Sequence, residues 1–184
     1  AITEVEQTIY LAFLLVVLVI FFFLRDWRTS LIPVIVIPIS LIGSFFIMYV
    51  AGFSINVLTL LGLVLAIGLV VDDAIVVIEN IYSKIEKGVP PMQAGLEGSA
   101  EIFFAVIATT VALATVFLLV IFLEGLTGRL FREFGIVLSG SVIISSFVAL
   151  TLTPMLSTRL LKRREKHNAF YEWTEPFFNK LASI

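Results

Sequence analysis

The sequence predicts an all-α protein, a polytopic bundle of five transmembrane helices with an amphipathic helix on the cytoplasmic surface. Hydrophobic residues make up 60% of its 184 residues and charged residues only 14%, whereas soluble domains contain about 45–50% and 25%. The apolar residues form five long runs, each close to the roughly 20 residues that cross a bilayer as a helix. Helices are expected because lipid cannot satisfy open backbone hydrogen-bonding groups.

The five runs divide the chain into a membrane bundle, residues 1–161, and a tail, residues 162–184. The predicted spans cover about residues 5–24, 31–50, 57–78, 102–123 and 134–158. The longest link between spans, Ile81 to Glu101, contains Gly88, Pro90 and Pro91. These residues interrupt helices, so we expect a break in this link, with a short cytoplasmic helix opening at Pro91.

The basic residues predict the orientation. With five spans, ten of the 12 Lys and Arg residues fall on the side of the C-terminus and only Arg129 and Arg132 on the other. By the positive-inside rule, the C-terminal tail is cytoplasmic and the N-terminus lies outside, in the periplasm of a Gram-negative cell. A chain that starts with Ala1 outside the membrane is expected to be a piece of a longer protein.

The tail combines a basic cluster with aromatic residues near helical spacing. Residues 162–166 read Lys-Arg-Arg-Glu-Lys, and Phe170, Trp173, Phe177 and Leu181 follow. This pattern predicts a basic linker and an amphipathic helix on the inner membrane surface. A disordered basic tail is the alternative.

Two adjacent carboxylates, Asp72 and Asp73, lie inside the third apolar run. Each costs about 2.5–3.5 kcal/mol on insertion scales, and such residues usually mark ion or proton pathways. Desolvation disfavours the ionised form, and a nearby cation would favour it. The pair is therefore a candidate proton-translocation site, and a structural role in joining helices by hydrogen bonds is the alternative.

A helical wheel of the third run places polar and small residues on two stripes about 100° apart. Asp73 and Asn80 belong to the first stripe, and Gly68, Asp72 and Glu79 to the second. The opposite face is bulky and apolar. Both aspartates are therefore expected to point into a protein interior, toward different neighbours, while the bulky face suits lipid or an apolar helix.

Four further residues are candidates for support of the aspartates. Gly68 allows a close helix approach, and Glu79 and Asn80 end the polar stripes. Ser146 belongs to a small, weakly polar stripe of the fifth run, whose expected role is close packing, with a water relay as the alternative.

We predict no metal site, because metal-ligand spacings are missing from the sequence. No Lys or Arg lies within the spans, so the aspartates are either protonated at rest or paired with a cation elsewhere.

The segment from Gly62 to Asn80, GLVLAIGLVVDDAIVVIEN, strongly resembles the aspartate helix of the resistance–nodulation–division (RND) efflux transporters. The paired aspartate is similar to that of the hydrophobe/amphiphile, or multidrug, branch. Stretches that resemble other family signatures follow the same order: LRDWRTSLIP at 24–33, FSINVLTL at 53–60, TGRLFREF at 127–134 and LTLTP at 150–154.

The resemblance implies helices two to six of the N-terminal transmembrane half of an inner-membrane drug/proton antiporter. By motif match, Asp72 and Asp73 correspond to the proton-carrying pair, driven by the proton motive force without a cofactor. The lysine partner would come from the C-terminal half. The family further implies a homotrimer that docks to a periplasmic adaptor and an outer-membrane channel. We expect no nucleic-acid partner.

Two other functional classes fit the sequence less well. An intramembrane aspartyl protease needs two facing carboxylates that share a proton, whereas neighbours on one helix diverge by about 100°. A channel or purely structural bundle would carry rings of polar residues, but only one run is strongly polar. The sequence therefore favours a secondary active transporter over an enzyme.

Overall fold

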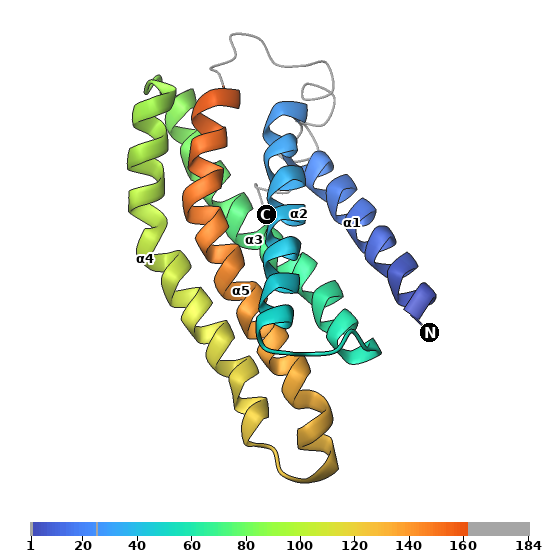
Figure 1. The fold of residues 1–184 in the computed structure, drawn as a ribbon. Helices are drawn as coiled ribbons and strands as arrows, with labels where there is room; N and C mark the ends of the chain where they lie inside the picture. Colours follow the sequence, from blue (N-terminus) through green and yellow to red (C-terminus); the bar gives the residue numbers. More distant parts are fainter. Residues whose placement is uncertain (1, 25, 162–184) are drawn as a thin grey trace, which may run out of the picture.

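The computed structural model describes residues 2–24 and 26–161, and these ranges form a bundle of long helices without strands (Figure 1). Its elements are α1 (Ile2–Leu24), α2 (Trp27–Val50), α3 (Val57–Glu86), α4 (Pro91–Leu118), the 3-10 helix η1 (Leu119–Phe122) and α5 (Gly125–Leu160). The all-α fold class is thereby confirmed. The predicted amphipathic segment, 162–184, lies outside the described residues.

Within residues 2–24 and 26–161, four helical segments are long and apolar enough to cross a membrane. They are Trp27–Val50, Val57–Glu86, Pro91–Phe122 and Phe131–Leu160. The uninterrupted apolar part of α1, Gln7–Phe22, is shorter. This helix therefore depends on its more polar flank to reach across a bilayer of about 30 Å.

The helix break predicted at Gly88, Pro90 and Pro91 is confirmed, but the connection is shorter than the predicted link. Helix α3 continues to Glu86 and α4 begins at Pro91, so only four residues, 87–90, connect them. The turn is a Schellman motif: Val89 N–H donates to Lys84 O at 3.1 Å and Gly88 N–H to Ile85 O at 3.0 Å. Gly88 adopts φ 93°, which a side chain would disfavour. Pro91 opens α4 itself rather than a separate short helix.

Helix α5 also begins earlier than the predicted span, at Gly125 rather than at residue 134. A capping box starts α3, in which the Asn56 side chain accepts from Thr59 N–H at 2.9 Å. The amide of Asn56 also donates to Glu133 of α5 at 2.8 Å. The extended N-terminal turns of α5 therefore anchor the start of α3.

Helix α5 is the centre of the bundle. It packs against α2, α3, α4 and η1, while α1 packs against α2 and α3 (Figure 1). The small stripe on α5 is fully buried, as close packing requires. Its members are Ser139, Val142, Ser146, Ala149 and Thr153. The expectation that this stripe packs closely is confirmed.

Candidate functional site

Helix α3 holds Asp72 and Asp73 near its middle, on the side away from its bulky face. That bulky face is buried: Leu63, Ile67 and Ile78 are at most 1% exposed. It packs with residues such as Ile20 of α1 and Ile37 of α2. Of the two predicted roles for the bulky face, contact with an apolar neighbour is therefore the observed one.

We expected both aspartates to point into a protein interior, and within the described bundle only Asp73 does so in part. Asp73 is half-buried, but Asp72 is exposed, as are Gly68 and Glu79 on the same stripe. The wheel gives the angle between two stripes correctly but not which stripe the neighbouring helices cover. In the described bundle, the stripe of Asp72 is the open one.

Asp72 lines a cavity of about 650 Å³ between α1 and α3. Leu15, Val19 and Ile20 form the apolar wall on α1. The α3 wall carries Gly68 and Asp72 and, two turns further along, Glu79. Two carboxylates thus face one largely apolar cavity, and no Lys or Arg is among its described lining residues.

The backbone beside the aspartates is tied to the central helix. Ser145 of α5 donates from its hydroxyl to the carbonyl oxygen of Val70 at 3.1 Å. This carbonyl lies less than one helical turn before Asp73. The neighbouring Ser146 is buried, and among the described residues its hydroxyl has no hydrogen-bond partner. Ser145 is therefore a contact that the sequence pattern missed, one position from the predicted Ser146.

We predict that Ser145→Ala lowers the stabilising free energy of the contact between α5 and α3 by about 0.6 kcal/mol. This is the average contribution of an interhelical hydrogen bond in membranes. Hydrogen exchange of the α3 amides near Ala74, measured in lipid nanodiscs, should rise about threefold. Ser141→Ala is the matched control, because that hydroxyl bonds Val137 O within α5 at 2.7 Å. Equal exchange in the two variants would contradict the prediction.

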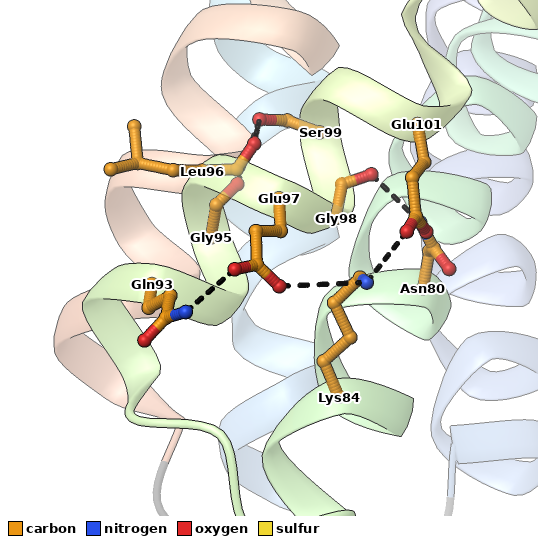
Figure 2. Close-up of polar contacts among 9 residues, drawn as sticks. All are labelled: Asn80, Lys84, Gln93, Gly95, Leu96, Glu97, Gly98, Ser99 and Glu101. Atoms are coloured by element: carbon orange, nitrogen blue, oxygen red, sulfur yellow. Dashed lines mark hydrogen bonds and ion pairs between the residues drawn. The ribbon is translucent and has the colours of Figure 1, made fainter.

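Asn80 belongs to a polar cluster that joins α3 to α4 (Figure 2). Its amide donates to the carbonyl oxygen of Gly98 at 2.7 Å and to Glu101 at 3.3 Å. One turn further along α3, Lys84 donates to Glu101 at 2.7 Å and lies 3.8 Å from Glu97. Asn80 therefore belongs to the α3–α4 contact, in which Glu101 accepts from both Asn80 and Lys84.

Close approach of the two helices makes this cluster possible. A Cβ atom at Gly98 would stand 2.9 Å from Ile81 Cγ1 and 3.1 Å from Ile81 Cα, which leaves no space for a side chain. Gly68 differs, since nothing in the described bundle lies within 4 Å of its would-be Cβ. The glycine that brings helices together here is thus Gly98, while Gly68 lies on the open stripe.

Comparison with known proteins identifies the family. The family model described as the AcrB/AcrD/AcrF family matches residues 1–184. The chain is 50% identical over 168 residues to a protein named "Multidrug resistance protein MdtC" from Pectobacterium atrosepticum, which covers 91% of the chain. Proteins of the same name from Photorhabdus laumondii and Escherichia coli O139:H28 are 52% and 50% identical over 88% and 86% of the chain.

The chain spans only 16% of the length of these curated relatives. The match nevertheless covers the whole chain, including the aspartate pair on α3 and the helices that surround it. This chain therefore belongs to the AcrB/AcrD/AcrF family, which confirms its resemblance to the RND transporters.

Proposed function

We propose that this chain is the proton-translocating transmembrane part of an inner-membrane drug/proton antiporter that exports hydrophobic or amphiphilic compounds. The observation that carries the proposal is the adjacent pair Asp72 and Asp73 in a membrane-length apolar helix, with Asp72 lining an apolar cavity. The name of the relatives, which refers to multidrug resistance, supports the class of substrate.

The carboxylates are proposed to carry the proton. Moving one elementary charge through the membrane potential is worth about 2.3 kcal/mol per 100 mV, and protonation removes the charge of a carboxylate. The proton acts as a ligand that shifts the transporter between conformations by its different affinity for each. Among the described residues, neither aspartate makes a hydrogen bond or ion pair, which favours this role over that of joining helices.

The supporting residues take different parts in this proposal. Glu79 shares the cavity with Asp72 and is a candidate step on the proton's path. Asn80 holds the end of α3 against α4, and Ser146 is available to a water or a polar group in another state. Gly68 keeps the open stripe of α3 accessible to a neighbouring segment.

The open stripe also supports the proposed partners. We propose that the C-terminal transmembrane half covers it and supplies a lysine to the aspartates, because a buried carboxylate is normally paired. The complete protein is proposed to be a homotrimer of the Gram-negative inner membrane with a periplasmic adaptor and an outer-membrane channel. The basic side of the bundle, with Lys84 and Arg159, is proposed to be cytoplasmic and the N-terminus periplasmic.

Infrared difference spectroscopy of the full-length transporter in lipid tests the role of the aspartates directly. Spectra recorded from about pH 4 to 9 span the usual range of carboxyl titration and its shifts. We expect a carboxyl band that changes with pH and disappears in Asp72→Asn or Asp73→Asn. If both variants retain every pH-dependent carboxyl band, the aspartates do not take up the proton and the coupling site lies elsewhere.

A further inference from the structure

Two arginines from distant parts of the chain line one cavity at an end of the bundle. The start of α2 and the end of α5 lie at the same end of the bundle (Figure 1). There, Arg28 and Arg159 line a cavity of about 230 Å³ together with Trp27, Leu31 and Leu160. The Arg28 guanidinium lies 5.5 Å from the centre of the Trp27 ring. The fold thus gathers two positive charges at one small cavity.

This cavity is cationic. Within residues 2–24 and 26–161, neither guanidinium makes an ion pair, and no acidic side chain lines the cavity. The nearest acid in sequence, Asp26, is only 9% exposed and accepts from the Thr29 hydroxyl at 3.0 Å. The cavity therefore presents two guanidinium groups without a described counter-ion.

An apolar groove adjoins the cationic cavity. The groove has a volume of about 400 Å³, runs between α1 and α2, and shares Trp27 and Leu31 with the cavity. Leu14, Leu18 and Phe21 of α1 line it. No charged residue is among its described lining residues. The two spaces together offer a positive end and a long apolar end.

We propose that the cationic cavity and the groove bind one anionic phospholipid of the surrounding bilayer. Arg28 and Arg159 would hold its phosphate, since guanidinium groups form paired hydrogen bonds to phosphate oxygens. One acyl chain would occupy the groove between α1 and α2. A phospholipid suits this site because it carries a charged group and a hydrocarbon chain in one molecule, and the cationic cavity and the apolar groove share Trp27 and Leu31 in their walls.

The depth of the site supports a lipid occupant. Arg28 and Arg159 lie at the ends of the membrane-length segments Trp27–Val50 and Phe131–Leu160. Ends of such segments lie at the level of lipid headgroups, where Trp is also enriched. A free phosphate ion would use only the cationic cavity and would leave the groove without a role.

Native mass spectrometry of the full-length transporter tests the site. The protein is exchanged into mixed micelles with equal amounts of phosphatidylglycerol and phosphatidylethanolamine, and the retained lipids are counted. We expect phosphatidylglycerol to be enriched. Each of Arg28→Gln and Arg159→Gln should lower its affinity about fivefold, as expected for one basic residue at an anionic surface. Arg28→Lys and Arg159→Lys, which keep the charge, should retain part of the enrichment.

Lys87→Gln is the matched control, because Lys87 is an exposed cation in the α3–α4 turn at the same end of the bundle and lines neither space. Val34→Trp fills the groove and should reduce retention of both lipids. The proposal is overturned if phosphatidylglycerol is not enriched, if Lys87→Gln lowers retention as much as Arg28→Gln, or if inorganic phosphate alone displaces the lipid. Lipid retention is measured without transport, so a failure here is independent of the proposed proton role.

Discussion

Export is expected to fall to the level of cells without the transporter when Asp72→Asn or Asp73→Asn is introduced into the full-length protein. Asparagine keeps the shape of the side chain but cannot bind and release a proton near neutral pH. At 100 mV, one coupled proton contributes about 2.3 kcal/mol, so its loss lowers the attainable drug gradient about 50-fold. Drug accumulation in cells that express each variant at equal levels measures this effect.

The control for this prediction is Glu86→Gln, which makes the same chemical change on an exposed residue at the end of α3. This variant should export normally. Both aspartate variants should also assemble normally, because neither carboxylate holds a hydrogen bond in the described bundle. If a variant exports at the normal rate, the substituted aspartate does not carry the proton. If a variant fails to assemble, that aspartate has a structural role.

Long apolar runs made the helices predictable from the sequence, but not their ends. Hydropathy reports where a helix meets lipid, and a helix that continues into water carries no such signal. The last six residues of α3, 81–86, and the first eleven of α4, 91–101, therefore appeared to belong to a long link between the spans. Gly88 and Pro90 do mark the true turn, which is only four residues long.

Partners across helices were the least predictable part of the site. Lys84 and Glu101 are 17 residues apart, and no spacing rule within one helix relates them. Their contact depends on the short turn and on the close approach at Gly98, which only the folded hairpin reveals. The exposed position of Asp72 was missed for a similar reason, because a wheel contains no information about where α1 and α5 lie.

Gly98→Leu is the second substitution for which we expect a large effect. The side chain would collide not only with the Ile81 side chain but with its backbone, at 3.1 Å from Cα and 3.3 Å from N. Side-chain ends can rotate away from such a contact, but a helix backbone must move as a whole. Overpacking of this kind costs about 1–3 kcal/mol, and here it would push α4 away from α3.

This displacement would also break the polar cluster at the same place. Asn80 donates to the carbonyl of Gly98 itself, at 2.7 Å, so the residue that permits the close approach also supplies the hydrogen-bond acceptor. We expect the amides of residues 80–86 to exchange about 5- to 150-fold faster in Gly98→Leu. Hydrogen exchange by mass spectrometry of the full-length transporter in nanodiscs measures the change.

Ala100→Leu provides the comparison, because Ala100 is exposed on the same helix two residues away and its side chain can grow without meeting α3. Unchanged exchange in Gly98→Leu, or an equal increase in Ala100→Leu, would mean that the α3–α4 contact does not hold the end of α3. If the contact does hold it, Gly98→Leu should also reduce export while Asp72 and Asp73 remain intact. A loss of export with both carboxylates present would show that proton coupling requires a fixed aspartate helix as well as its charges.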